Sequence, residues 1–210
     1  MAPIHHAARR GDVEQLRQLL AAGYSPNAIQ WMGGDFEPRR TPLHVLCRDC
    51  PKDRSGRVAC FELLRDAGAN LEASDSKGYR PLHFAAERGK KKMVSLLVQA
   101  RVNVDATANH NATALHLAAR SSRRGAPDCV ELLLAAGADI DARTSAGRRP
   151  FDLAIINVAP THRSHRIWPL FLRAGAEIPT DNTHPYIVRV RNAGGFQRYA
   201  QAHVARIASI

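Results

Sequence analysis

Apolar residues along this chain fall into two kinds of short block that alternate from one end to the other. In the first kind, alanines and leucines surround a histidine, as in TALHLAA at residues 113–119; related blocks occupy residues 81–86 and 41–44. In the second kind, a leucine run ends in Gly-Ala, as in residues 131–139; related blocks occupy residues 63–70 and 170–176. A unit that recurs every few dozen residues predicts a stack of repeats, each a pair of helices.

The spacing of the units shows where residues have been inserted. The first position of the histidine block falls at Ala2, Thr41, Arg80, Thr113 and Arg149, which gives spacings of 39, 39, 33 and 36 residues. We place the extra residues in the segment 29–40, between the helices of the second unit, and in the segments 121–127 and 160–166. All of these are expected to be turns, because loops tolerate added length and packed helices do not.

Local signals give the bounds of the helix pairs. Proline suits the first helical position, a preceding threonine can cap the helix, and glycine suits the left-handed residue that follows a helix. Arg101 stands where the other units have glycine, so we expect the third unit to end differently. The predicted helix pairs occupy residues 3–22, 42–67, 81–100, 114–136 and 150–174.

The order T-P-L-H-x-A-A, leucine-rich helix and G-A-D resembles the ankyrin repeat. The resemblance implies an all-α solenoid of helix-turn-helix units joined by β-turn or hairpin fingers. Its repeats would span residues 1–28, 29–73, 74–106, 107–142 and 143–179, in a domain of residues 1–179. Residues 180–210 are expected to form a helical C-terminal cap, with Phe196, Tyr199, His203 and Ile207 on one helical face.

Composition limits the setting and the partner. The formal net charge is +11 and the isoelectric point is about 10.3, which favours acidic partners. The arginine excess can reflect recognition of carboxylate or phosphate, or only a general compositional bias. No apolar run is long enough to span a membrane, and the N-terminus lacks the apolar stretch of a secretory signal. We therefore expect an intracellular monomer, in the cytoplasm, the nucleus or both.

Candidate chemistry is sparse. His44, Cys47, Cys50 and Cys60 have a spacing that zinc could use, but the histidine belongs to the repeat signature, where it hydrogen-bonds the neighbouring finger. Small buried cysteines explain Cys47 and Cys60, and only Cys50, beside the inserted turn, is free for another role. The ten histidines lack a nucleophile or carboxylate partner at a diagnostic spacing, and no phosphate-binding loop or H-E-x-x-H motif occurs. The sequence predicts no enzyme, no metal and no cofactor.

The resemblance implies a protein-interaction scaffold or adaptor that binds through a concave surface of fingers and first helices. The binding residues are therefore expected among positions that the repeat does not require, on a finger edge that is basic with aromatic interruptions. The candidates are Trp31, Met32, Phe36, Arg39, Arg40, Lys77, Tyr79, Arg80, His110, Arg148 and Arg149. Trp and Arg are frequent interface anchors, although Trp31 can equally pack on its own stack.

An alternative is a basic module that binds nucleic acid or an acidic membrane. Lys90, Lys91 and Lys92 lie in the turn between the helices of the third unit, and Arg120, Arg123 and Arg124 lie in the corresponding turn of the fourth. A regular stack would place the two groups side by side. They would then form either an anion-binding edge or simply a solvated face.

Overall fold

A computed structural model of the chain describes residues 2–29, 39–49, 54–156 and 164–176, together with residues 188, 192 and 194. The described part consists of helices and turns with one isolated bridge residue, Arg40, and has no β-strand. The all-α class predicted from the sequence is confirmed.

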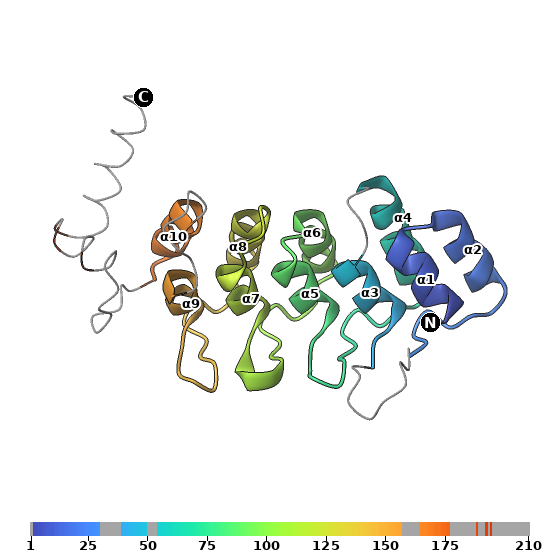
Figure 1. The fold of residues 1–210 in the computed structure, drawn as a ribbon, viewed down its shortest axis with the longest axis horizontal. Helices are drawn as coiled ribbons and strands as arrows, with labels where there is room; N and C mark the ends of the chain where they lie inside the picture. Colours follow the sequence, from blue (N-terminus) through green and yellow to red (C-terminus); the bar gives the residue numbers. More distant parts are fainter. Residues whose placement is uncertain are drawn as a thin grey trace.

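In the described residues, ten α-helices form five antiparallel pairs that stand side by side in a row (Figure 1). The first helices of the pairs are α1 (Pro3–Arg10), α3 (Pro42–Asp49), α5 (Pro81–Glu87), α7 (Ala114–Arg120) and α9 (Pro150–Ile156). The second helices are α2 (Val13–Ala21), α4 (Arg54–Asp66), α6 (Lys91–Gln99), α8 (Ala126–Ala135) and α10 (Ser164–Arg173). Each first helix packs on the next first helix, and among the second helices α2 packs on α4, α6 on α8 and α8 on α10. The connecting fingers lie along one edge of the row (Figure 1).

The first helices begin where the sequence predicts. Pro3, Pro42, Pro81 and Pro150 are first residues of helices, and Thr113 caps α7 by accepting a hydrogen bond from the His116 backbone N–H. Each fixed proline φ suits the helix, and the missing N–H would have had no partner inside it. All five pairs lie within the predicted bounds.

Two features differ from expectation: the way the third repeat ends and the structure of the insertion in the second repeat. Gly68 and Gly137 have φ of +83° after their helices, as predicted, but Arg101 adopts the same left-handed region at +59°. The third repeat therefore ends like its siblings, and the expectation of a different ending is wrong. Helix α4 has 13 residues where α6 has nine, so part of the second repeat's extra length is helical rather than a turn.

One continuous apolar core joins all the pairs, from Ile4 in α1 to Phe171 in α10. Ala85, Ala86, Ala118 and Ala119 have no exposed surface, because small side chains let adjacent first helices approach closely. Each pair buries its apolar face only against its neighbours, which is the basis of stability in a repeat stack. The predicted C-terminal cap at residues 180–210 lies almost wholly outside the described residues and stays a prediction.

Candidate functional site

A ladder of buried histidines fixes the fingers to the helices. In α3, α5 and α7 the histidine Nδ1 accepts the backbone N–H three residues earlier, at 3.0–3.2 Å. Nδ1 is therefore unprotonated, and Nε2 carries the proton that it donates to a carbonyl of the following finger. These 3.0 Å bonds run from His44 to Tyr79, from His83 to Ala106 and from His116 to Arg148, and His5 contacts the Arg40 carbonyl at 2.9 Å.

The ladder histidines stay neutral because they are buried. Burial lowers the pKa of His5 and His83 to about 4, and it also lowers the pKa of His44 and His116 below the usual 6.5. The accepting carbonyls oppose this shift but do not reverse it. These side chains hold adjacent repeats together through their bonds to the following finger.

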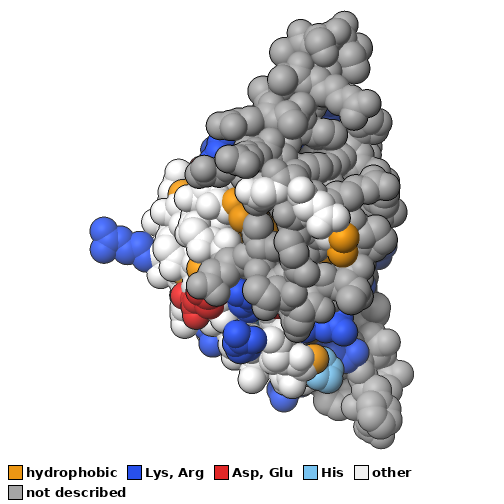
Figure 2. All heavy atoms as spheres, turned by 90° about the vertical axis from the view of Figure 1, so that its left-hand side faces the viewer, with side chains coloured by type: hydrophobic (Ala, Val, Ile, Leu, Met, Phe, Trp, Pro, Cys, Tyr) orange, Lys and Arg blue, Asp and Glu red, His pale blue; other side chains and the backbone are white. Residues whose placement is uncertain are grey.

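The first finger comprises residues 29–40, and the second, third and fourth fingers lie at residues 74–79, 107–112 and 143–148. Backbone bonds align the second, third and fourth fingers into one edge. The Asn109 N–H donates to the Lys77 carbonyl at 2.9 Å, and the Ser145 N–H donates to the His110 carbonyl at 2.8 Å. We call the surface formed by Arg39 and residues 76–80, 108–112 and 143–149 the finger edge. In an end-on view of the stack, Lys, Arg and His side chains gather toward the side of the fingers (Figure 2).

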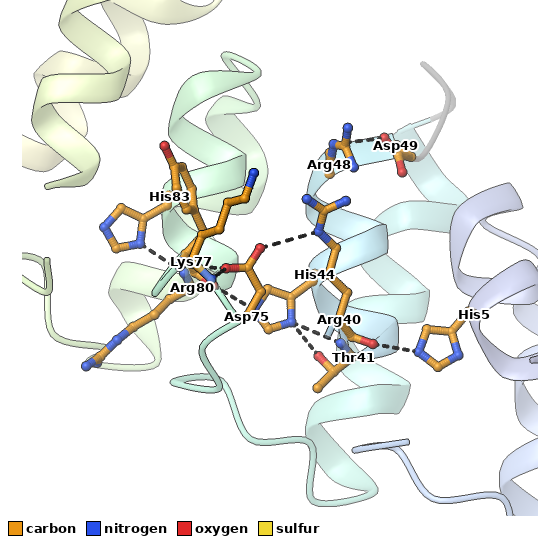
Figure 3. A network of polar contacts seen from close by, with 11 residues as sticks. His5, Arg40, Thr41, His44, Arg48, Asp49, Asp75, Lys77, Arg80 and His83 are labelled. Carbon is orange, nitrogen blue, oxygen red and sulfur yellow. Dashed lines mark hydrogen bonds and ion pairs between the residues drawn. The ribbon is translucent and has the colours of Figure 1, made fainter. Parts of the chain in front are cut away.

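A buried carboxylate organises the second finger. Asp75 accepts the backbone N–H groups of Lys77 and Tyr79, both at 2.9 Å, through Oδ1 (Figure 3). Its Oδ2 lies 3.5 Å from Nε of Arg40, whose guanidinium lies 4.9 Å from the centre of the Phe84 ring. Sequence reasoning missed this residue, although the pattern D-x-x-G in SDSKGY is a turn signal.

The predicted binding residues fall into three groups. Arg39, Lys77, His110 and Arg148 are exposed on the finger edge. Four others are partly buried and held within the stack: Arg40, Tyr79, Arg80 and Arg149. Trp31, Met32 and Phe36 lie outside the described residues.

The partly buried group is held by specific contacts. Tyr79 stacks on Phe84 with ring centres 5.4 Å apart, and Arg80 pairs with Glu72. The Arg149 side chain is only 13% exposed, pairs with Asp152 at 3.3 Å and lies 3.6 Å from Asp141. These side chains therefore mainly stabilise the finger edge from within, and little of their surface is exposed to a partner.

His110 is held in a conformation that side chains rarely adopt. His110 and Asn111 have φ of +61° and +54°, and Asn111 stands where the second and fourth fingers have Gly78 and Gly147. The Ala112 N–H bonds to the Asn109 carbonyl, so the two residues form the centre of a tight turn with left-handed geometry. The turn places an exposed imidazole at the tip of the third finger.

A groove of about 590 Å³ lies beside Arg39. It is lined from both ends of the first finger by Asn27, Ile29, Arg39 and Thr41, and from the segment leading into the second finger by Asn70 and residues 73–76. Because polar and apolar groups share its wall, the groove can accept a side chain of either kind next to an exposed guanidinium.

The residues with zinc-like spacing have other roles where they are described. His44 is committed to Thr41 and Tyr79, while Cys47 and Cys60 are buried in the core; Cys50 is outside the described residues. The described part of the chain contains no group of three His, Cys, Asp or Glu side chains that could hold a metal ion. Within that same part, no helix combines the length and apolar character that crossing a bilayer requires.

Comparison with known families identifies the repeats. A model described as "Ankyrin repeats (3 copies)" matches residues 50–144, and a model described as "Ankyrin repeat" matches residues 1–30. Together the two matches cover more than half of the chain.

Similar proteins share only this part of their length. XBAT31 of Arabidopsis thaliana is 31% identical over 160 residues, 70% of this chain and 32% of that protein. The tyrosine-protein kinase Shark of Drosophila melanogaster is 30% identical over 72% of this chain and 15% of its own length. Inversin of Mus musculus is 33% identical over 62% of this chain and 11% of its own length. The chain therefore spans a third or less of each of these relatives.

Proposed function

Because the chain belongs to the ankyrin repeat family, whose repeats are protein-interaction modules and generally non-catalytic, we propose that it is an interaction scaffold or adaptor. Its partner is a protein with an acidic segment, which binds along the finger edge and the adjoining concave face. The observation that carries the proposal is that the described carboxylates near the fingers have partners within the fold, whereas several exposed cations on the fingers have none.

Four carboxylates in the described part of the finger region have partners within the fold. Asp75 is buried, Glu72 pairs with Arg80, and Asp141 lies beside Arg149. Asp105 accepts the Asp139 N–H at 2.8 Å, so it too has an internal partner. Each of these described carboxylates therefore has a partner inside the fold, although Asp141 is also exposed.

The exposed cations have no such partners. Among the described residues, Arg39, Lys77 and Arg148 take part in no ion pair, and their side chains face solvent. A row of unpaired cations attracts an acidic partner and speeds its association. Trp31, Met32 and Phe36 of the first finger are the proposed apolar anchors, since aromatic side chains contribute strongly at interface centres.

A peptide-library selection on the intact chain tests the chemistry of the partner. We expect the selected peptides to be enriched in Asp and Glu, and their affinity to fall about tenfold when Lys77 and Arg148 are both replaced by alanine. The fold should survive this change, because its described contacts at these two positions use only the backbone.

A double variant with the same loss of charge, Arg17→Ala with Arg173→Ala, is the control, because these arginines lie on the second helices α2 and α10. It should keep its affinity for the selected peptides. Selected peptides without acidic enrichment, or equal losses in the two double variants, would overturn the proposal.

A further inference from the structure

A second concentration of positive charge lies away from the finger edge, where the paired helices meet. Lys90, Arg123 and Arg124 lie in the turns, as predicted, but Lys91 and Lys92 belong to the first turn of α6 and Arg120 is the last residue of α7. The sequence has only five lysines among its 30 Lys and Arg residues, and three of the five are consecutive at residues 90–92. A general preference for arginine does not explain this group. Residues 120–124 add three arginines in the next repeat.

The two turns are in direct contact. A Cβ placed on Gly125 would lie 2.1 Å from the Gly89 carbonyl oxygen, and one on Gly89 would lie 2.9 Å from Cβ of Arg123. The Ser121 hydroxyl also donates to the Glu87 carbonyl at 2.8 Å. Residues 88–92 and 120–124 therefore form one surface, which we call the turn cluster, and the expectation that they would lie side by side is confirmed.

Cations outnumber the nearby acids in the turn cluster. Glu87 forms an ion pair with Arg120 at 3.8 Å, and Asp128 forms one with Lys91 at 3.7 Å. Lys92, Arg123 and Arg124 are exposed and form no ion pair among the described residues. Helix α6 also begins here without an acidic residue in its first turn, so its positive end adds to the charge.

The surface lacks what a protein partner or a bilayer would use. The large hydrophobic side chains exposed in the described part of the chain are Tyr24, Ile29 and Val188, all outside the turn cluster. Protein interfaces depend on apolar and aromatic anchors, and membrane-surface binding depends on an inserted apolar face. A phosphodiester backbone needs only cations at its surface.

Further cations lie at the ends of the first helices of the first two repeats. Arg9 and Arg10 end α1 and are exposed, whereas Arg48 in the last turn of α3 pairs with Asp49 at 3.6 Å. Exposed positive charge therefore also occurs at this end of the α1 helix, as suits a polyanion partner. We propose that the turn cluster binds the phosphate backbone of double-stranded nucleic acid, without preference for base sequence.

Fluorescence anisotropy with two unrelated 20-base-pair DNA duplexes tests the proposal on the full chain. Both duplexes should bind equally, and the affinity should fall steeply with salt. Replacing Lys92, Arg123 and Arg124 by glutamine should weaken binding at least tenfold at low salt and reduce the slope of log affinity against log salt by about 3.

The matched control replaces Arg39, Lys77 and Arg148 on the finger edge by glutamine. This variant loses the same three charges and should bind DNA with nearly unchanged affinity. Equal losses in the two triple variants would show that net charge alone acts and would overturn the assignment. The assignment also fails if no duplex binds at low salt, or if only a polyglutamate peptide or phosphatidylserine vesicles bind through the turn cluster. Loss of peptide binding at the finger edge would not affect this result, so the two proposals fail independently.

Discussion

Adjacent arginines at the end of the first finger have different roles, which only the structure separates. Arg39 is exposed, while Arg40 is 18% exposed in its side chain and lies against the buried carboxylate of Asp75 and the ring of Phe84. The sequence predicted that both belong to a basic edge. It could not distinguish them, because the partner of Arg40 is 35 positions further along the chain.

Replacement of each arginine by alanine should separate stability from binding. Arg40→Ala leaves Asp75 buried without its cation and should lower the free energy of unfolding by about 3 kcal/mol. Arg39→Ala should change it by less than about 0.5 kcal/mol, as at most exposed sites. Urea unfolding of the two variants measures both values, and equal losses would contradict the assigned roles.

The starts and types of the helices follow from local sequence, whereas the packing of the turns does not. Proline and threonine signals located α3, α5 and α7, and the recurrence of the blocks gave their pairing. The extra length of α4 was missed because an insertion carries no sign of whether it extends a helix or a loop. The contact between Gly89 and Gly125 was missed because it joins two repeats through their backbones.

Gly125→Ala tests that contact. Gly125 has a negative φ of −89°, so the cost should come from the Cβ, which would meet the Gly89 carbonyl oxygen and push the turns apart. We expect a loss of about 3 kcal/mol, at the upper end for overpacking. Gly137→Ala is the comparison, since nothing lies within 4 Å of its Cβ and only the left-handed φ of +83° costs about 1 kcal/mol. An equal or smaller loss at Gly125, by urea unfolding, would contradict the close approach.

The buried histidines that join the repeats make the free energy of unfolding depend on pH. In the folded chain the pKa of His83 is about 4, against 6.5 for the free side chain, so the unfolded chain binds more protons between these values. Stability should therefore be fully present above about pH 7 and fall as the pH is lowered through 6.5 toward 4. The difference is worth about 3 kcal/mol for His83 alone.

Urea midpoints measured between pH 7.5 and 5 check this dependence, in a range where most carboxylates stay ionised. The midpoint should fall with pH in the native chain and less steeply in His83→Gln, which lacks one titrating group. A midpoint that is constant over this range would show that the ladder histidines are not held neutral by burial.

At the scale of the whole molecule, the sequence predicted the architecture but not the partner. One core runs through all five pairs, so the stack presents its fingers in fixed order. Exposed cations on the finger edge and in the turn cluster were among the sequence candidates. Which of the arginines are paired within the fold depends on contacts between repeats, and these are set by the stacking.

Hydrogen–deuterium exchange of the intact chain, alone and with a selected acidic peptide, tests the central claim most directly. We expect slower exchange in residues 75–80, 108–112 and 144–149 when the peptide is bound, because binding covers the finger edge. The turn cluster and the second helices α2, α4, α6 and α8 should exchange as in the free chain. Protection confined to those helices or to residues 88–92 and 120–124 would show that the finger edge is not the partner-binding surface.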